Sequence, residues 1–206
     1  MKITRLNNYF TDENTYLLTE NGTGAVIDPG YKTEGILRAA SDAGVTIKYV
    51  LLTHCHYDHM EFLEELREKT GAKLICGAQC SENIGNPDIN LTLGGLGRAV
   101  SAKPAEIILS DGGEFDMDGM KIKCILTPGH TSCGVCYLAG GHVFTGDTLF
   151  LRNCGRWDLP TGNEEQLYKS IREKLYTLPD DTAVHPGHGN PSTIGYEKKF
   201  NMFVKA

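Results

Sequence analysis

The sequence contains no long apolar run and no concentration of positive charge. No stretch approaches the ~20 consecutive apolar residues that a membrane-spanning helix requires, and the segment Met1–Arg5 lacks the apolar block of a signal peptide. The 26 acidic side chains outnumber the 20 basic ones, which gives a formal net charge of -6 and leaves no basic stripe to neutralise phosphates. These absences argue against membrane and nucleic-acid partners and make the cytoplasm the expected location.

Internal repeats, low-complexity tracts and flexible linkers are also missing. A folded chain of 206 residues removes roughly 70% of its unfolded surface from water, so one domain with a sizeable core is expected. The seven cysteines are an odd number and are dispersed along the chain. Because they do not follow the spacing of a small disulfide-bonded domain, we expect reduced thiols.

Strand-like and helix-like segments alternate along the N-terminal part of the chain. Short apolar runs at 16–18 and 25–27 flank an Asn-Gly turn signal and predict a hairpin. A helix is predicted to begin at Thr33, which would serve as its cap, and to stop at Gly44. A buried strand is predicted at 47–52.

The rest of the chain continues this alternation. A helix bearing Met60, Leu63 and Leu66 is expected to stop at Gly71, and residues 77–113 are expected to form loops and short turns. Beyond them, strands at 121–126, 135–138 and 143–144 are expected to form a second β layer. A helix capped by the pair Asn163 and Gln166 is expected to run to Leu175. A last strand is expected at 182–184 and a short terminal helix after Ser192. This order predicts the α/β class, with two sheets and helices outside them.

The strongest chemical signal is a group of four potential metal ligands within six positions. The run HCHYDH at residues 54–59 directly follows the predicted buried strand. Because side chains alternate in extended backbone, His54 and His56 point to one side and Cys55 points toward the core. A turn after His56 brings Asp58 and His59 to a neighbouring position. The spacing suits two metal ions better than one, and imidazole and carboxylate ligands favour zinc, iron, manganese or nickel.

Three further candidate ligands, His130, Asp147 and His188, each follow a predicted strand through a turn that contains glycine. A residue at the carboxyl end of a strand is well placed for a site at the edge of a sheet. A single histidine is usually structural, but the recurrence of this context predicts a metal centre.

In these motifs the chain resembles the metallo-β-lactamase-fold hydrolases and, among them, the glyoxalase II-like branch. Beside the His-x-His-x-Asp-His block, the shared features occur in the family order as Ile27-Asp28-Pro29-Gly30, Thr127-Pro128-Gly129-His130-Thr131, Thr145-Gly146-Asp147-Thr148-Leu149-Phe150, Gly155-Arg156 and Pro186-Gly187-His188-Gly189. The resemblance covers nearly the whole chain. It implies a single-domain, four-layer αββα sandwich with a dinuclear site at one edge of the two sheets.

The resemblance also implies two divalent cations, with zinc expected and iron or manganese as alternatives. The ligands would be divided into His54, His56 and His130 for one ion and Asp58, His59 and His188 for the other, with Asp147 bridging both. Asp28 would stand behind the ligands. Asp58 and Asp147 are the candidate catalytic residues.

A dinuclear site of this kind needs no side-chain nucleophile. Two cations ~3.5–4 Å apart lower the pKa of a shared water from near 16 toward ~7, so that a metal-bound bridging hydroxide attacks the substrate carbonyl. A thioester suits the site because its thiol ionises near pH ~8.5 and leaves as a thiolate without a proton donor. An amide nitrogen would need a proton, for which Asp58 is the one candidate donor. The predicted function is hydrolysis of S-2-hydroxyacylglutathione or a similar small-molecule acyl-thiol.

Substrate recognition has two candidate features. Arg156 either pairs with a substrate carboxylate or forms an ion pair with Asp158. Tyr9, Tyr31 and Tyr57 either line a substrate groove or pack as half-buried residues. Glyoxalase II also carries a C-terminal helical region that helps to hold glutathione. Since this sequence stops soon after the last ligand, the resemblance implies that the region is missing or reduced to one helix.

Two other enzymatic functions are alternatives on this fold. A mononuclear iron persulfide dioxygenase, which the residues at 149–150 and 154–156 also resemble, would use His56, His130 and Asp147 as a facial triad. A lactonase is the second alternative. A ribonuclease is disfavoured by the acidic charge balance. A non-catalytic metal-binding protein is disfavoured because seven ligand positions carry a cost in desolvation.

Other polar and sulfur-containing residues are expected to be structural. Cys133 and Cys136 form a C-x-x-C motif, but only one such pair exists and Cys136 falls in a predicted strand. Buried thiols are therefore expected rather than a redox pair or half a zinc site. Cys55 is expected in the core. His142 is expected at a sheet edge, and His185 is not expected to share an ion with His188.

Overall fold

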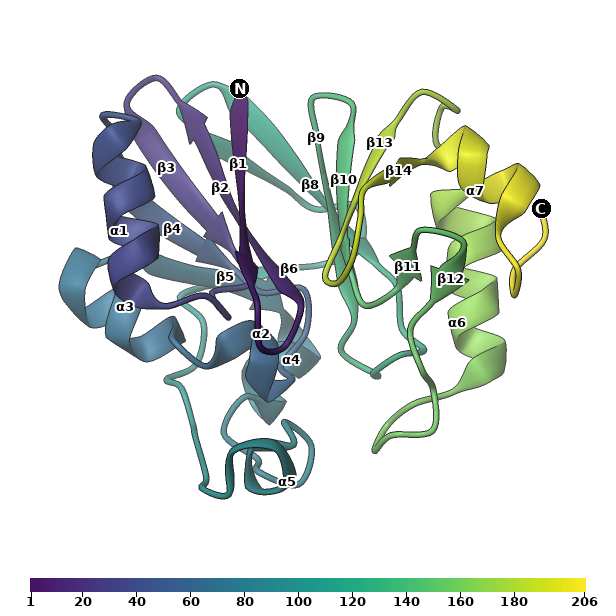
Figure 1. Ribbon diagram of the computed structural model, residues 1–206, viewed down its shortest axis with the longest axis horizontal. Coiled ribbons are helices and arrows are strands. Elements are labelled where there is room, and N and C mark those ends of the chain that lie inside the picture. Colours follow the sequence, from purple (N-terminus) through teal and green to yellow (C-terminus); the bar gives the residue numbers. More distant parts are fainter.

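The first half of the chain forms a six-stranded mixed sheet in the computed structural model, which describes residues 1–206 (Figure 1). Its strands lie in sequence order as β1 (Lys2–Asn8), β2 (Glu13–Glu20), β3 (Thr23–Ile27), β4 (Thr46–Leu51), β5 (Lys73–Gly77) and β6 (Ile107–Leu109). The pairs from β1 to β3 are antiparallel, which confirms the predicted hairpin. The pairs from β3 to β6 are parallel, so the carboxyl ends of these strands meet at one edge.

The second half forms another six-stranded sheet that faces the first (Figure 1). Its strands follow the spatial order β14 (Ser192–Thr193), β13 (Ala183–Pro186), β10 (His142–Gly146), β9 (Val135–Ala139), β8 (Met120–Leu126) and β7 (Glu114–Met117). A small ribbon of β11 (Leu149–Phe150) and β12 (Asn153–Cys154) lies beside it. β10 and β13 are parallel, so they deliver the residues that follow them to the same edge.

Helices cover the outer faces of both sheets. On the side of the first sheet lie α1 (Thr33–Asp42), α2 (Tyr57–Met60), α3 (Leu63–Thr70), α4 (Ala78–Asn83) and α5 (Thr92–Leu96). On the side of the second lie α6 (Glu164–Ser170), its π-helical continuation at Ile171–Leu175, and α7 (Ile194–Phe200) (Figure 1). The molecule is therefore the single-domain αββα sandwich that the sequence predicted. No helix combines the length and the apolar character needed to cross a membrane.

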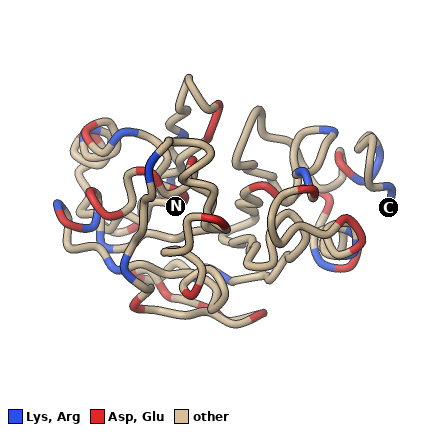
Figure 2. The backbone as a smooth tube through the Cα atoms, turned by 90° about the horizontal axis from the view of Figure 1, so that it is seen from below, with Lys and Arg blue, Asp and Glu red and all other residues tan.

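Alternation along the strands builds three buried layers. On β2, Tyr16 and Leu18 belong to the cluster between the two sheets, whereas Leu17 belongs to the cluster beneath the helices of the first sheet. A third cluster, which contains Leu167, lies between the second sheet and α6. β2 thus carries apolar side chains on both faces, because each face packs against another layer. Figure 2 shows Lys and Arg interspersed with Asp and Glu over both halves of the backbone.

Several predicted helix ends differ from the structure. Thr33 is the first helical residue rather than the cap, and its buried hydroxyl has no hydrogen-bond partner. The helix predicted through Met60 and Leu66 is interrupted after Met60, because the backbone N–H of Phe62 donates to the carbonyl of Pro29. The predicted stops at Gly44 and Gly71 are confirmed, with φ angles of 67° and 70°.

The C-terminal half follows the prediction more closely. Asn163 caps α6 by accepting a hydrogen bond of 2.9 Å from the N–H of Gln166, and the apolar face of the helix is fully buried. The strand predicted at 182–184 lies slightly later, at Ala183–Pro186. The two-residue strand β14, which was not predicted, comes next, and the short terminal helix follows it. The segment 77–113 was expected to hold loops and turns only, but it contains α4, α5 and β6. Six- and five-residue helices and a three-residue strand are too short to give a periodic signal.

Gly129 offers a test of how tightly α6 holds the loop that carries His130. Gly129 has a φ of 143°, and a Cβ there would lie 2.2 Å from the N and Cα atoms of Leu167. We expect Gly129→Ala to lower the free energy of unfolding by about 3 kcal/mol or more, from strain plus overpacking. Gly44→Ala, where a Cβ meets nothing within 4 Å, should cost only about 1–2 kcal/mol. If urea unfolding showed the same loss of unfolding free energy for both variants, the close contact between Gly129 and α6 would be contradicted.

Candidate metal centre

The segment after β4 places its side chains as alternation predicts. His54 and His56 are 2% and 4% exposed and face the edge shared by the two sheets. Cys55 between them is fully buried in the cluster beneath the helices. The single turn of α2 then carries Asp58 and His59 round to the same edge, with the His59 ring completely buried.

The three remaining candidates arrive from the second half of the molecule. His130 follows β8, Asp147 directly follows β10, and His188 comes two residues after β13. The potential ligand atoms of His54, His56 and His130 all lie within 4.8 Å of one another. Asp58, His59 and His188 form a second such group, so all seven predicted ligands meet in two adjoining sets with Asp147.

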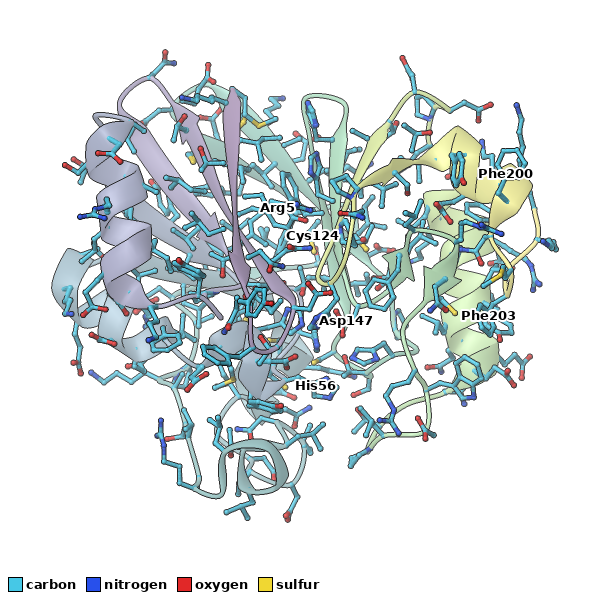
Figure 3. The ribbon with its side chains drawn as sticks, viewed as in Figure 1. Arg5, His56, Cys124, Asp147, Phe200 and Phe203 are labelled. Carbon is cyan, nitrogen blue, oxygen red and sulfur yellow. The ribbon has the colours of Figure 1, made fainter.

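Asp147 stands between the two sets. Its Oδ1 lies 3.3 Å from His59 Nε2, and its Oδ2 lies 3.6 Å from the Nε2 atoms of both His130 and His188. Gly187 allows this approach, since a Cβ there would lie 2.4 Å from Asp147 Oδ1. Figure 3 shows Asp147 and His56 near the centre of the molecule, between the two sheets. One carboxylate thus reaches both sets.

Asp28 holds His59 in place from behind. The His59 Nδ1–H donates to Asp28 Oδ2 at 3.0 Å, which leaves Nε2 facing the other ligands. Asp28 also accepts hydrogen bonds from the N–H of Thr53 at 2.8 Å and from its hydroxyl at 2.6 Å. Its φ of 50° is unusual for a residue other than glycine and marks a constrained backbone. Sequence reasoning placed Asp28 behind the ligands but missed Thr53.

Backbone carbonyls hold two other imidazoles. His130 donates from Nδ1 to the carbonyl of Arg156 at 2.7 Å, and His188 donates from Nδ1 to the carbonyl of Thr11 at 3.2 Å. In each ring the inward Nε2 atom is therefore left to interact within the site. Sequence reasoning missed both partners. A carbonyl oxygen is common to every residue, so no side-chain pattern indicates it.

Unsatisfied polar atoms indicate that these residues fit metal cations. His54 Nε2, His56 Nε2 and Asp147 Oδ1 are buried and have no hydrogen-bond partner. The His59 and His188 Nε2 atoms lie 3.3 Å apart, although their outer nitrogens both donate hydrogen bonds elsewhere. Buried polar atoms without partners are costly. A divalent cation satisfies such atoms, and the imidazole and carboxylate donors suit zinc, iron or manganese.

The two sets differ in the protons they hold. Burial lowers the pKa of His54 well below its usual value and lowers that of His56 to about 4. Burial acts in the same direction on His59 and His188, but the neighbouring carboxylates, chiefly Asp147, raise both pKa values above the usual range. Without a cation, His54 and His56 therefore favour the neutral form that coordinates metal, whereas His59 and His188 favour protons that a cation must displace.

The candidate substrate contacts have different environments. The Arg156 guanidinium makes a two-pronged ion pair with Asp158, at 2.7 and 2.8 Å, and the pair is exposed. In this structure Arg156 therefore forms the predicted ion pair with Asp158, and its contact with a substrate stays a prediction. Tyr9, Tyr31 and Tyr57 all line one cavity of about 500 Å³. Its lining includes Tyr57, which directly precedes Asp58, and Thr11, whose carbonyl accepts the hydrogen bond from His188, but none of the candidate ligands.

The remaining histidines lie apart from the centre. His142 Nδ1 on β10 and His185 Nε2 on β13 are 2.9 Å from each other, and neither residue belongs to the groups of candidate ligands. The His185 ring packs against Tyr16 and Phe144. As expected, His185 does not join His188, and His142 serves below as a control.

Fold and site together define a class of proteins, αββα sandwiches that gather histidine and aspartate ligands at an edge shared by two sheets. A family model described as the metallo-beta-lactamase superfamily matches residues 9–188 of this chain. The chain belongs to the metallo-beta-lactamase superfamily.

Two relatives are similar over most of their length. A protein named probable metallo-hydrolase, from Streptococcus pyogenes, is 36% identical over 211 residues, which cover 98% of this chain and 90% of the relative. The hydroxyacylglutathione hydrolase GloC of Haemophilus influenzae is 31% identical over 196 residues, which cover 88% of this chain and 87% of the relative.

Solved structures match the whole fold. The BLEG-1 B3 metallo-beta-lactamase superposes with a TM-score of 0.93 and 28% identity, over 100% of both chains. TTHA1623, solved in a di-iron-bound form, has a TM-score of 0.85 and 30% identity, over 98% of this chain and 100% of its own. ETHE1 from Myxococcus xanthus has a TM-score of 0.83 and 30% identity, over 98% of this chain and 84% of its own.

If the site holds metal, adding zinc should stabilise the protein. At a free concentration 100-fold above the dissociation constant, we expect the free energy of unfolding to rise by about 2.7 kcal/mol per site, measured as a shift in Tm. His56→Ala should remove most of the increment. His142→Ala should keep it, whatever its effect on the basal stability, and a zinc increment unaffected by His56→Ala would place the ion elsewhere.

Metal binding should release protons from the second set. Because the pKa values of His59 and His188 are raised above the ordinary histidine value, cations compete with protons for both rings. We expect the apparent affinity of the more weakly bound ion to rise as pH increases from 6 to 8. Calorimetric titrations in two buffers of different ionisation enthalpy measure the released protons, and binding without proton release would contradict the assignment.

Proposed function

We propose that this protein hydrolyses thioesters with the help of two divalent metal ions, taking S-2-hydroxyacylglutathione or a similar acyl-thiol as substrate. The observation that carries the proposal is the position of Asp147 between two sets of inward-facing ligands. Similarity to the hydroxyacylglutathione hydrolase GloC supports the reaction, and similarity to TTHA1623 in its di-iron-bound form supports two ions. Zinc is the expected metal, with iron or manganese as alternatives.

The histidines and the carboxylates at this site have different roles. Two bound cations would supply an ionised water near neutral pH and an electrophile for the substrate carbonyl. His54, His56 and His130 are almost fully buried and fix the inner wall of the site. The side chains of Asp58 and Asp147 remain 18% and 13% exposed, so both carboxylates border the space from which a substrate approaches.

The ionisation of these carboxylates favours a thioester over an amide. Burial opposes ionisation of Asp58, but the neighbouring His59 and His188 lower its pKa below the usual value. A carboxyl group in this state is ionised at neutral pH and is a poor proton donor. A thiol with a pKa near ~8.5 departs without a donated proton, whereas an amine does not. The site is therefore better suited to releasing a thiolate.

The cavity lined by Tyr9, Tyr31 and Tyr57 is the proposed place for the substrate. Besides its three tyrosines, the cavity is lined by Phe10 and Phe62 and by the charged side chains of Lys32 and Glu61. Phe10 is 91% exposed, so an apolar part of a substrate can cover it. Aromatic walls with one charge of each sign suit a small molecule with polar ends, which agrees with an acyl-thiol substrate.

A mononuclear iron persulfide dioxygenase is the second candidate. His56, His130 and Asp147 meet closely enough for a facial triad, because His130 Nε2 lies 3.0 Å from His56 Nδ1 and 3.6 Å from Asp147 Oδ2. The similarity to ETHE1 from Myxococcus xanthus is the other observation that favours it. This candidate leaves the second set without an assigned metal, so we rank it below the hydrolase.

Activity measurements separate these functions. We expect protein reconstituted with zinc, at two ions per chain by elemental analysis, to hydrolyse S-lactoylglutathione. Asp147→Asn should reduce kcat/KM by about 100-fold or more, because it removes the shared ligand charge, while His142→Ala should leave kcat/KM unchanged. One iron per chain with oxygen consumption on a glutathione persulfide would overturn the proposal in favour of the dioxygenase. Hydrolysis confined to lactones would assign a lactonase.

A further inference from the structure

The two cysteines of the C-x-x-C motif lie in different settings, because Cys133 is in the turn before β9 and Cys136 is on that strand. Cys133 belongs to the buried cluster beneath the helices of the first sheet, whereas Cys136 belongs to the cluster beneath α6. The Cys136 thiol contacts the hydroxyl of Thr127 at 3.2 Å and the carbonyl of Thr145 at 3.7 Å. The motif therefore does not form a redox pair, as the sequence predicted.

Cys133 instead faces a cysteine from the other half of the molecule. Its Sγ lies 3.7 Å from the Sγ of Cys55, although 78 positions separate them in the sequence. Because a disulfide is about 2.05 Å long, the two sulfur atoms need to approach by less than 2 Å. Cys55 stands between His54 and His56, and Cys133 follows His130 by three residues, so a bond between them would join the two segments that carry the three-histidine set.

The two thiols differ in their access to small molecules. Cys133 lines a cavity of about 550 Å³, together with Gly77, Ser132 and Gln166. Cys55 is completely buried and lines neither this cavity nor the one lined by Tyr9, Tyr31 and Tyr57. A small oxidant can therefore reach Cys133 first, and the Cys55 sulfur lies in direct contact with it.

We propose that Cys133 is a site of oxidation by hydroperoxides and that Cys55 resolves it to a Cys55–Cys133 disulfide. The Cys133 sulfur attacks the peroxide, the O–O bond breaks, and a sulfenic acid forms while the peroxide's other oxygen leaves as water or an alcohol. The Cys55 sulfur then attacks the sulfenic sulfur, and hydroxide leaves as water. The two thiols lose two electrons and two protons, and the hydroperoxide accepts both.

Closing this bond acts directly on the metal centre. The His56 Nδ1 and His130 Nε2 atoms lie 3.0 Å apart, and each is close in the chain to one of the two cysteines. A shift of the sulfur atoms toward each other moves the attached backbone segments and disturbs the separation of the two imidazoles. The disulfide thus weakens binding at the three-histidine set. This effect rests on the proposed metal centre, but formation of the disulfide does not.

Peptide mapping tests the disulfide without reference to activity. Zinc-loaded protein is treated with hydrogen peroxide, remaining thiols are alkylated, and the product is digested with trypsin without reduction. We expect the peptide Tyr49–Arg67, which contains only Cys55, to be linked to the peptide Cys124–Arg152. Because the second peptide contains three cysteines, fragmentation of the linked species identifies the bonded sulfur as that of Cys133.

Matched variants assign the bond independently. Cys136→Ser and Cys124→Ser should retain the linked species, and Cys133→Ser should lose it. Cys80, which lies in the same buried cluster, is the competing partner. A link from Cys133 to Cys80, overoxidation of Cys133 without any link, or no reaction at Cys133 would each overturn the proposal. The wild-type map alone decides between these outcomes if Cys133→Ser does not fold.

The effect on the metal centre is measured on the same sample. Oxidised protein should bind zinc at its tightest site about tenfold more weakly or worse, in competition with a chromophoric chelator, and a thiol reductant should restore the affinity. Cys55→Ala should abolish this peroxide effect. A disulfide that forms without changing zinc affinity would overturn the predicted consequence, whereas absence of thioester hydrolysis would bear on the proposed function alone.

Discussion

The inward direction of the buried imidazoles is the constraint on which the site depends. Asp28 and two backbone carbonyls accept hydrogen bonds from the outer nitrogens of His59, His130 and His188, so the inner nitrogens face one another and Asp147. Burying such groups without partners is costly, and only a cation or a proton relieves the cost. The raised pKa values of His59 and His188 indicate that, without a cation, protons are favoured on these two imidazoles.

The sandwich meets this constraint by bringing strand ends together. β4 supplies one ligand segment, and the parallel pair β10 and β13 supplies the residues after Gly146 and Pro186 at the facing edge. Glycine at position 187 lets this chain approach the Asp147 carboxylate. The ligands therefore come from distant parts of the sequence, yet each is held by a rigid element. In the proposed function, the ionised carboxylates and the tyrosine-lined cavity favour a small substrate whose leaving group needs no proton.

Much of this arrangement was predictable, because it depends on local periodicity. Alternation after β4 indicated that Cys55 faces away from His54 and His56, and repeated strand ends indicated the remaining ligands. Contacts made by the backbone were not predictable. The hydrogen bond from Phe62 to Pro29 splits a helix, and the Arg156 carbonyl orients His130 without any side-chain signal. The spatial pairing of Cys55 with Cys133 likewise depends on tertiary packing, which spacing in the sequence does not encode.

Anomalous diffraction at the zinc edge, from crystals of the zinc-loaded protein, tests the metal centre most directly. Two peaks about 3.5–4 Å apart are expected, with the Asp147 carboxylate between them. The first should lie within bonding distance of His54, His56 and His130, and the second of Asp58, His59 and His188. A single peak outside these residues, or imidazoles without any ion among them, would contradict the two-cation centre.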